Sequence, residues 1–591
     1  MHRAPSSAMA RTEEFAMTAV RPLGPEQRAQ AWADLAAGDF EVLVIGGGVT
    51  GAGVALDAAT RGLKTALVEA RDFASGTSSR SSKLFHGGLR YLEQFDFGLV
   101  REALHERDLA VNRIAPHLVK PVPFLYPLTR HWERPYVTAG ITLYDALARF
   151  GGLADPMPAQ KQLTRTGARR LFPALKPESL VGAIRYYDAQ ADDARHTLTV
   201  ARTAAAYGAT VLNSAEVVSF EHAGGRVVGA KVRDVETGNE VDVCSEVVVN
   251  ATGVWTDDVQ TLVGGRGRFH VRASKGVHIV VPRDRINGET GLILRTEKSV
   301  LFVIPWGSHW IVGTTDTDWE LDKAHPAASK ADIDYILEHV NEVLSVPLTH
   351  ADITGVYAGL RPLLSGEQES TSQLSREHAV ARPMPGVIAV AGGKYTTYRP
   401  MAADAVDAVA EDVTRRVPPS VTENIPLVGA EGYAAMVNSL DGLSDRWGIP
   451  RFRAEHLINR FGSLTPEVLD LATDAPELLE PVPGAEEYLM VEMVWSAAHE
   501  AALHLDDLLA RRTRISIETP HRGVESAEPV ARAVAGVLGW DDERIASEVE
   551  SYTARVEAER RSQEAADDQE ADAARVAAPD TRAVAVGRAL G

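Results

Sequence analysis

The chain alternates short apolar runs with longer segments in which apolar residues recur every three or four positions. The short runs are rich in β-branched residues, as buried strands are, and they cover residues 42–45, 65–68, 209–212, 247–249 and 387–390. The segments with helical periodicity cover residues 25–37, 52–60, 98–114, 192–207, 329–344 and 395–413. Because the two kinds of segment alternate, the pattern predicts an α/β fold built on a parallel sheet.

Two regions depart from this alternation. Between residues 269 and 318 the strand-like stretches VHIVVP, LFVIPW and WIVGTTDTDW are separated by turns, which predicts a mostly antiparallel second domain. A hairpin turn is expected at residues 236–239, which read ETGN. Beyond residue 430 helical periodicity dominates, notably over residues 486–511. The tail after residue 562 is rich in alanine and charge, and we expect it to be disordered.

An amphipathic stripe runs through residues 136–150, where Val137, Ile141, Tyr144 and Ala148 share one side. A helix packed on the core of a domain explains this stripe. A helix seated in a membrane interface explains it as well. Both interpretations stay open at the level of the sequence.

Net charge, cysteine content and the length of apolar runs exclude several classes of protein. The formal charge of −20 argues against a nucleic-acid partner and provides no general attraction to anionic lipid. The single cysteine, Cys244, excludes an internal disulfide, fits a reducing cytoplasm and lies in an apolar run where we expect it to be buried. No apolar run reaches the roughly 18 residues of a membrane span. The N-terminus lacks the apolar core of a signal peptide. No metal site is predicted.

The most informative stretch covers residues 40–70, which read FEVLVIGGGVTGAGVALDAATRGLKTALVEA. A strand leads into Gly46, Gly48 and Gly51, a helix follows, and a second strand ends at Glu69. In a dinucleotide site the first glycine makes the turn, the second admits a pyrophosphate and the third lets helix and strand pack closely. The helix N-terminus attracts the phosphates, and the acidic residue accepts hydrogen bonds from ribose hydroxyls. The sequence therefore predicts a dinucleotide site.

Three further segments are candidate cofactor contacts. Residues 71–91 are too rich in Ser, Thr and Gly for regular structure, and their hydroxyls and amides could surround phosphates and a flavin edge. The other two segments, residues 250–255 and 391–394, each follow a predicted strand. Ligands bind at the carboxyl ends of parallel strands. The candidates are Thr77, Ser78, Ser82, Gly87, Gly88, Ala251, Thr252, Gly253, Gly392, Gly393 and Lys394.

Cationic side chains recur beside glycines and strand ends, at His86, Arg90, Arg361, Arg376 and Lys394. Several cations at one strand edge would suit a phosphate dianion, each charge-assisted hydrogen bond contributing about 1.5–3 kcal/mol. For any one of them alone, a structural ion pair explains the charge as well as a ligand does. Tyr91 and Thr396 join them as candidate substrate contacts, although a buried tyrosine or a helix-capping threonine would explain them equally well.

These motifs resemble those of the FAD-dependent glycerol-3-phosphate dehydrogenases, in the D-amino-acid-oxidase-like flavoprotein superfamily. The resemblance is carried by GGGVTGAGVALDAATRGL, TSSRSSKLFHGGLRYLE, NATGVW, FVIPW, GTTDTD, GLRPL, SREH and GGKYTTYR, in that order from residue 46 to residue 399. The combination of HGGLRYLE and GGKYTTYR is far more specific than the glycine motif. Val254 stands where proline is common in the family.

The resemblance implies non-covalently bound FAD and the oxidation of sn-glycerol 3-phosphate to dihydroxyacetone phosphate by hydride transfer from C2 to flavin N5. It implies catalytic roles for His86, Arg361 and Lys394, and substrate contacts from Arg90, Tyr91, Arg361, Arg376, Lys394 and Thr396. His86 could act as the base or as a hydrogen-bond donor holding flavin or loop backbone. Lys394 could contact substrate or stabilise reduced flavin. The implied electron acceptor is a quinone. A cytoplasmic protein held peripherally on the inner face of the cell membrane would reach it, and a homodimer is a further possibility.

The resemblance also suggests domain boundaries. We expect an N-terminal extension over residues 1–38 and an FAD-dependent oxidoreductase region over residues 39–412. Within it, the Rossmann-like FAD-binding domain would take residues 39–115, 185–268 and 352–412. The inserted antiparallel substrate domain would take residues 116–184 and 269–351. A linker at 413–430, a C-terminal helical domain at 431–562 and a disordered tail at 563–591 would follow.

Other functions remain compatible with these residues. A glycerol-3-phosphate oxidase would pass the electrons to oxygen, and no motif decides the acceptor. A flavin amine or amino-acid oxidase would share the dinucleotide motif but not the need for so many cations. A flavin-bound interaction module without activity would leave those cations unexplained.

Overall fold

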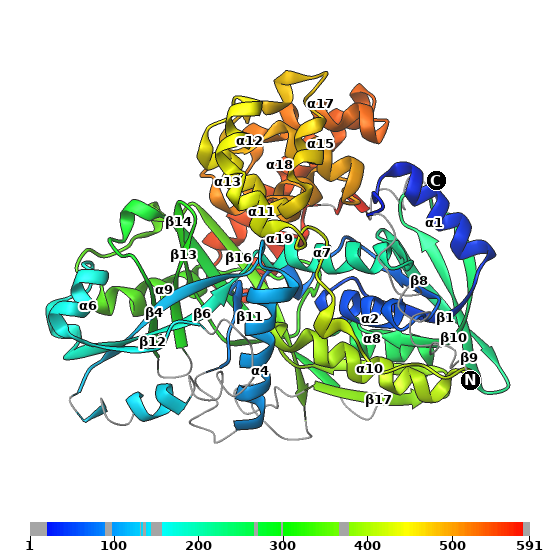
Figure 1. Cartoon of the computed structure of the whole chain (residues 1–591), viewed down its shortest axis with the longest axis horizontal. Helices are drawn as coiled ribbons and strands as arrows, with labels where there is room; N and C mark the ends of the chain where they lie inside the picture. The colour runs from blue at the N-terminus through cyan, green and yellow to red at the C-terminus, as the bar shows by residue number, and fades with distance from the viewer. Residues whose placement is uncertain are drawn as a thin grey trace, which may run out of the picture.

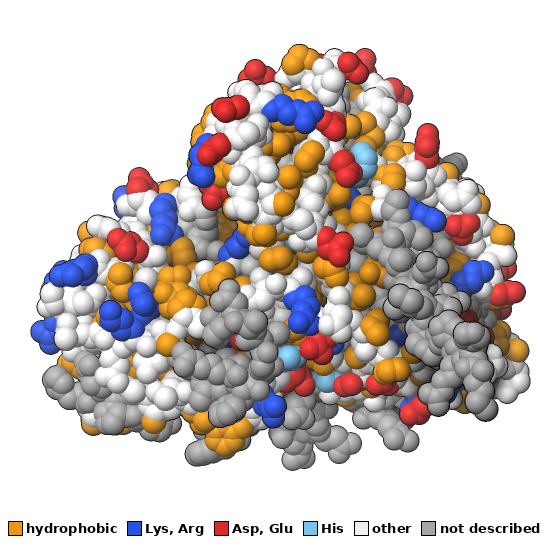
Figure 2. Space-filling view, viewed as in Figure 1, with side chains coloured by type: hydrophobic (Ala, Val, Ile, Leu, Met, Phe, Trp, Pro, Cys, Tyr) orange, Lys and Arg blue, Asp and Glu red, His pale blue; other side chains and the backbone are white. Residues whose placement is uncertain are grey.

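The computed structural model describes residues 20–88, 97–130, 132–133, 137–143, 157–264, 270–296, 300–365, 378–578 and 580–582. Two sheets lie side by side, and a helical region that contains α12, α13, α15, α17 and α18 sits over their junction (Figure 1). On the face shown in Figure 2, acidic and basic side chains are interspersed over all three parts. The predicted combination of an α/β region, an antiparallel domain and a helical C-terminal region is therefore confirmed.

The first sheet contains the parallel strands that the apolar runs predicted. Its order is β17-β18-β10-β1-β2-β7, and β8 and β9 extend it from β10 as an antiparallel ribbon. The strands are β1 (Asp39–Ile45), β2 (Thr65–Val68), β7 (Thr210–Leu212), β8 (Ala215–Ala223), β9 (Arg226–Asp234), β10 (Glu240–Asn250), β17 (His378–Met384) and β18 (Val387–Gly392). The predicted turn at residues 236–239 joins β9 to β10. The last four residues of β1 and of β10 are all buried, so these strands supply apolar side chains to both faces of the sheet.

Helices cover both faces of this sheet. On one face α2 (Val49–Thr60) lies between α7 (Asp193–Ala206) and α10 (Tyr398–Asp412), and all three pack on the same core as Val42 and Val44. On the other face α1 (Pro25–Ala37) and α8 (Thr256–Val263) pack on Leu43 and Val68. Helices α2 and α7 are buried nearly all round, so their burial extends beyond the single apolar side that periodicity predicted.

The second sheet is mostly antiparallel, with order β15-β11-β14-β13-β12-β4-β6-β3, while β16 pairs with β11 and β5 with β6. Its strands are β3 (Leu84–Phe85), β4 (Lys120–Leu128), β5 (Lys161–Thr164), β6 (Gly182–Gln190), β11 (His270–Pro282), β12 (Gly291–Arg295), β13 (Val300–Trp306), β14 (His309–Gly313), β15 (Thr317–Trp319) and β16 (Gly355–Ser365). Helices α6 (Arg165–Leu171) and α9 (Lys330–Val343) pack on one face, and α4 (Phe97–Leu109) packs on the other.

Strand pairing differs from the predicted domain boundaries in three places. The prediction assigned β3 and β16 to the FAD-binding domain, and it placed a boundary inside β6. β16 pairs with β11 along its whole length, from Gly355 opposite Val280 to Ser365 opposite His270. An apolar strand does not reveal from its own sequence which sheet will accept its hydrogen bonds.

The segment at residues 486–511, predicted as helical, is not one helix. It contains β20 (Ala485–Leu489), which pairs with β19 (Pro481–Val482), then α15 (Met490–His499) and the start of a π-helical turn, Asp507–Arg512. The Asp507 carboxylate accepts from the backbone N–H groups of Leu503 and His504, at 2.9 and 3.1 Å. Such local bonds give the backbone an alternative to helix.

The other helices of the C-terminal region are mostly short, and α17 and α18 are the two longest. They are α11 (Tyr433–Asn438), α12 (Leu440–Trp447), α13 (Arg451–Phe461), α14 (Thr465–Asp470), α16 (Ile515–Glu518), α17 (Val524–Leu538), α18 (Asp542–Glu564) and α19 (Asp568–Val576). None of the helices in the described part of the chain is long and apolar enough to cross a bilayer.

The prediction of a disordered tail from residue 563 onward is wrong for the described residues 563–578 and 580–582. Helix α19 is ordered there, and its Ala571 is buried against the second sheet with Trp319 and Leu360. Asp568 pairs with Lys275 of β11, and the Arg582 side chain is buried. The alanine-rich, charged composition suggested a chain that could not pack. Its charges instead find buried partners on the other regions. Residues 583–591 lie outside the described part.

Two smaller expectations have different outcomes. Cys244 lies on β10 as predicted, but its side chain is exposed, because alternate residues of this part of the strand face solvent. In the stripe at residues 136–150, Val137 and Ile141 are buried in the core of the second sheet. Tyr144 and Ala148 lie outside the described residues. The described part of the stripe therefore packs as a core helix does.

Candidate functional site

A cavity of about 920 Å³ lies where the carboxyl ends of β1, β2, β10 and β18 face the second sheet. It brings together most of the residues predicted from the sequence. The predicted residues that line it are Gly46, Gly48, Glu69, Thr77, Ser78, Ser82, His86, Ala251, Thr252, Gly253, Arg361, Gly392, Gly393, Lys394 and Thr396. The carboxyl edge of a parallel sheet is where ligands of this fold class bind.

The glycine motif has the geometry that a dinucleotide requires. Gly46 adopts φ +111°, a conformation that favours glycine. A Cβ on Gly51 would lie 1.9 Å from the Gly46 carbonyl oxygen, so only glycine allows this approach of helix and strand. Gly48 faces the cavity directly before the N-terminus of α2. The residues present therefore fit the pyrophosphate of a dinucleotide.

Glu69 stands at the end of β2, on the cavity wall. Its carboxylate accepts from the backbone N–H groups of Gly47, at 2.6 Å, and Arg71, at 2.8 Å. Burial raises the pKa of Glu69, while these two bonds act in the opposite direction. The bonds orient the carboxylate as an acceptor at the place where a ribose would lie.

Hydroxyls of the loop at residues 71–88 mostly hold the loop itself. Ser78 Oγ accepts from the Val49 N–H at the start of α2, at 2.9 Å. Thr77 Oγ1 donates to the Leu360 carbonyl at 2.6 Å, which ties the loop to the second sheet. Ser82 Oγ lies 2.9 Å from Nε2 of His278. Gly87 and Gly88 are buried beside His86 but do not line the cavity.

Arg361 lies on β16 in the cavity wall and is held by several protein groups. Its guanidinium lies 3.2 Å from Asp316 Oδ1 and donates to Thr314 Oγ1 at 3.1 Å. It also donates to the Thr315 carbonyl at 3.2 Å. Its side chain is 28% exposed. Both interpretations of this residue thus find support, because it forms an ion pair and also faces the cavity.

His86 and Thr396 are joined through the backbone. Thr396 Oγ1 accepts from the His86 N–H at 3.2 Å and lies 3.3 Å from the His86 carbonyl. Gly393, with φ +74°, and Lys394 follow β18 and reach the same wall. The segment that contains His86 and the segment that follows β18 are thereby brought together. Arg90, Tyr91 and Arg376 lie outside the described residues.

The site contains side chains that the sequence did not single out. His278 of β11 lies in the cavity wall, bonds Ser82 and stacks on Tyr357 with ring centroids 4.8 Å apart. Burial, then Arg361 and Lys83, lower the pKa of His278 well below its ordinary value, so the imidazole is neutral. Lys83 is buried and pairs with Asp193 at 2.7 Å. A histidine inside an apolar strand carries no signal in the sequence that would separate it from a core residue.

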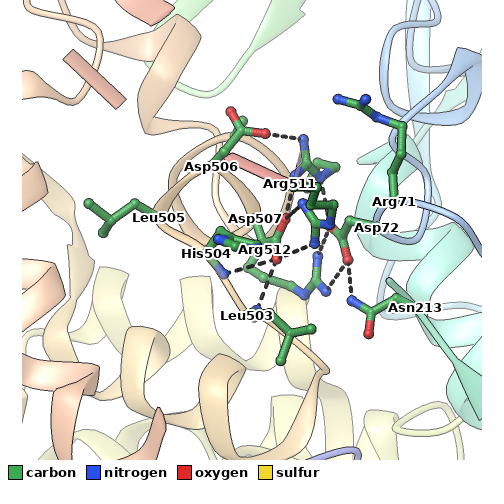
Figure 3. A network of polar contacts seen from close by, with 12 residues as sticks. Arg71, Asp72, Asn213, Leu503, His504, Leu505, Asp506, Asp507, Arg511 and Arg512 are labelled. Atoms are coloured by element: carbon green, nitrogen blue, oxygen red, sulfur yellow. Dashed lines mark hydrogen bonds and ion pairs between the residues drawn. The ribbon is translucent and has the colours of Figure 1, made fainter. Parts of the chain in front are cut away.

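A buried network fixes the helical region beside this loop (Figure 3). Asp72 accepts from Arg511 Nε at 2.6 Å, from two nitrogens of Arg512, each at 2.8 Å, and from Asn213 at 3.0 Å. Arg511 also pairs with Asp507 at 2.6 Å. The loop that approaches the cavity is therefore anchored from the C-terminal helices.

Comparison with known proteins identifies this architecture. The pattern of the FAD dependent oxidoreductases matches residues 41–402. That of the C-terminal domain of alpha-glycerophosphate oxidase matches residues 420–545. Glycerol-3-phosphate dehydrogenase 2 of Mycobacterium tuberculosis is 63% identical over 562 residues, which cover 95% of each chain. The chain belongs to the FAD-dependent glycerol-3-phosphate dehydrogenases. The family named from the motifs is confirmed.

More distant members of the family share both sequence and fold. The human mitochondrial glycerol-3-phosphate dehydrogenase is 36% identical over 550 residues, 89% of this chain and 74% of that protein. The X-ray structure of the glycerol-3-phosphate dehydrogenase from Bacillus halodurans, complexed with FAD, has a TM-score of 0.74 at 29% identity. It covers 90% of this chain and 98% of that one. The likeness therefore extends over the helical C-terminal region.

Proposed function

We propose that this protein oxidises sn-glycerol 3-phosphate to dihydroxyacetone phosphate with FAD. The observation that carries the proposal is one cavity in which the dinucleotide motif and the cationic residues His86, Arg361 and Lys394 share a wall. The names of its relatives, up to 63% identical, support the same activity.

Non-covalently bound FAD would be held by the Gly46–Gly51 turn, the N-terminus of α2 and Glu69. When bound, FAD supplies the acceptor for the hydride that leaves C2 of the substrate. The loop at residues 71–88 and the segments after β10 and β18 enclose the remainder of the cavity. Water exclusion by these segments would strengthen every charge interaction inside.

The phosphate of the substrate would be bound by Arg361 and Lys394, with Arg90 and Arg376 completing the set. Asp316 and Thr314 hold the Arg361 guanidinium in place before substrate arrives, so less side-chain freedom is lost on binding. His86 would take the proton of the C2 hydroxyl, since a histidine side chain ordinarily has a pKa of about 6.5, which suits proton transfer at neutral pH. Thr396 holds the backbone of His86 for this task.

A quinone is the proposed electron acceptor, reached by peripheral contact with a membrane. Three large exposed apolar side chains support such a contact: Phe97, 42% exposed, Trp132, 63%, and Leu143, 40%. Phe97 begins α4, and Leu143 ends the described part of the neighbouring helical segment. Both segments pack their other sides into one core, through Val100, Val137 and their neighbours.

The visible spectrum of the purified protein tests the proposed reaction. Under anaerobic conditions, the flavin band should bleach on addition of glycerol 3-phosphate and persist on addition of glycerol. Bleaching by both alcohols would contradict recognition of the phosphate. A flavin band that neither compound changes would contradict the proposed substrate.

A further inference from the structure

A second cavity, of about 120 Å³, lies where the loop at residues 71–88, the second sheet and the C-terminal helices meet. It adjoins the FAD cavity, and Arg71, Arg80, Asp580 and Arg582 line both. The C-terminal segment after α18 contributes Arg575 and Asp580 to its wall. Nothing in the proposed reaction uses this cavity.

Arginines dominate the wall, and most of them are paired with carboxylates. Arg71 pairs with Asp580, and Arg511 with Asp506 at 2.6 Å. Arg80 differs from them. Its Nη1 donates to the Ala324 carbonyl at 3.2 Å, and no carboxylate of the described residues pairs with it. Arg80 is half-buried, and a guanidinium largely removed from water is costly unless an opposite charge compensates it.

The surroundings of Arg80 are strongly positive. Burial first, and then Arg511, Arg575 and Arg71, lower the pKa of Arg80 to about 10, against the opposing effect of Asp506. His325 lies among the same cations, with Nδ1 3.1 Å from Arg575 and Nε2 3.3 Å from Arg71. Burial and these two arginines lower the pKa of His325 as well. Arg71 and Arg575 therefore lie close to both Arg80 and His325.

The carboxylates of the wall do not cancel this positive charge, because each has its own partners. Asp506 lies between Arg511 and Arg555, at 2.6 and 3.0 Å. Glu559 pairs with Arg555 and Arg575. Asp580 is held by Arg71 and by His325, and these contacts lower its pKa against the effect of burial. Among the described residues, no carboxylate therefore forms an ion pair with Arg80, and Asp506 acts on it only from a longer distance.

We propose that this second cavity binds a small tetrahedral oxyanion of the phosphate class. Arg80 would supply the principal contact, since a planar guanidinium matches phosphate oxygens with two parallel donors. The hydroxyl-bearing residues Ser79 and Ser562 also line the cavity. The volume exceeds the roughly 30 Å³ share of a single water in the liquid, so it has room for a small ion. The anion would join the loop at residues 71–88 to the C-terminal segment.

The anion can be a free ion or a phosphate of FAD, because the two cavities adjoin. Crystals of the FAD-loaded protein soaked in tungstate distinguish these sources. We expect an anomalous peak within hydrogen-bonding distance of the Arg80 guanidinium, separate from the FAD phosphates. The absence of that peak, or an FAD phosphate oxygen in its place, would overturn the proposal of a separate site.

Melting temperatures of the FAD-loaded protein in inorganic phosphate provide a second readout. The phosphate-induced rise should fall at least two-fold in Arg80→Gln, whereas Arg80→Lys should retain it. Arg560→Gln is the matched control, since this exposed arginine of α18 donates to the Pro520 carbonyl outside the cavity. An unchanged rise in folded Arg80→Gln would overturn the proposal. If that variant does not fold, the tungstate map of the wild-type protein decides. The bleaching experiment above tests the reaction independently of this site.

Discussion

Arg361 shows how one side chain can satisfy two requirements. A guanidinium has five N–H donors in a fixed plane, so orientation by protein groups and contact with a phosphate are compatible. Asp316, itself mostly buried, sets that orientation. From sequence alone, an ion pair and a ligand were equal alternatives for this arginine. The structure places the ion pair in the wall of the cavity, where it can prepare the arginine for a ligand.

We predict that Arg361→Ala raises KM for glycerol 3-phosphate and leaves FAD content unchanged. Loss of a charge-assisted hydrogen bond of about 1.5–3 kcal/mol corresponds to a loss of about ten- to a hundred-fold in kcat/KM. Arg272→Ala is the control, because Arg272 forms a more exposed ion pair with Asp318 on the same sheet, at 3.1 Å. Steady-state kinetics with a dye acceptor measure both. An unchanged KM in Arg361→Ala would remove Arg361 from the substrate site.

The requirement for glycine at position 51 is steric. A methyl group there would meet a backbone carbonyl at 1.9 Å, which cannot move without displacing β1 or α2. We predict that Gly51→Ala lowers bound FAD and destabilises the fold by about 1–3 kcal/mol or more. Gly442→Ala, in α12, has nothing within 4 Å of its new methyl and should stabilise by about 0.5–1 kcal/mol. Flavin absorbance and denaturant unfolding measure these effects. Normal FAD content in Gly51→Ala would show that the motif tolerates a wider turn.

At the scale of elements, periodicity predicted the three helices on one face of the first sheet well, but it missed α6 and α8. The helices α2, α7 and α10 begin and end within three residues of the predicted bounds. Segment 486–511 failed because its apolar residues serve a strand, a helix and a π-helical turn in succession. Hydrogen bonds between side chain and backbone, which periodicity does not report, set the breaks.

The exposed ends of α4 and its neighbouring segment carry a prediction at the same scale. Replacing both Phe97 and Trp132 with serine should reduce the fraction of protein that sediments with quinone-containing vesicles by several-fold. Each exposed aromatic side chain contributes about 1.5–3 kcal/mol when it leaves water. Phe452→Ser is the matched control, because Phe452 is 62% exposed on α13 of the helical region. Equal loss in both proteins, or no loss in either, would contradict a membrane contact at α4.

At the scale of the molecule, His504 joins two regions distant in the sequence. Its Nδ1 lies 2.9 Å from Glu548 of α18, and its Nε2 lies 3.0 Å from Glu236 of the β9–β10 turn. Burial lowers the pKa of His504, but the two carboxylates outweigh burial and raise it to about 10. The histidine is therefore charged in the folded protein at neutral pH, and its charge helps to hold the helical region on the FAD-binding sheet.

This linkage predicts a pH-dependent contribution to stability. A folded-state pKa raised above the unfolded value means that the contribution of His504 is complete below about pH 6.5 and is lost as pH rises through about 10. His504→Gln should therefore be less stable than the wild type by a few kcal/mol at low pH, and the difference should shrink toward pH 10. Denaturant unfolding at several pH values, with exposed His222→Gln as the control, measures the difference. A difference that does not change with pH would contradict a charged His504.

The local sequence determined much of this protein by itself. The glycine spacing, Glu69 and the alternating apolar runs specified the dinucleotide unit, because turn geometry, helix periodicity and strand burial depend on neighbours in the chain. The motifs around His86 and Lys394 identified the family for the same reason, since each is a short continuous segment.

Tertiary structure alone decided which distant segments meet. β16 joined the second sheet because β11 offered it a complete hydrogen-bonding edge. The charged tail became ordered because the buried Lys275 and the half-buried Arg71 supplied partners for Asp568 and Asp580. His278 entered the cavity wall for no reason visible in its own segment. Burial and charge pairing depend on residues hundreds of positions away, and only the folded chain brings those residues together.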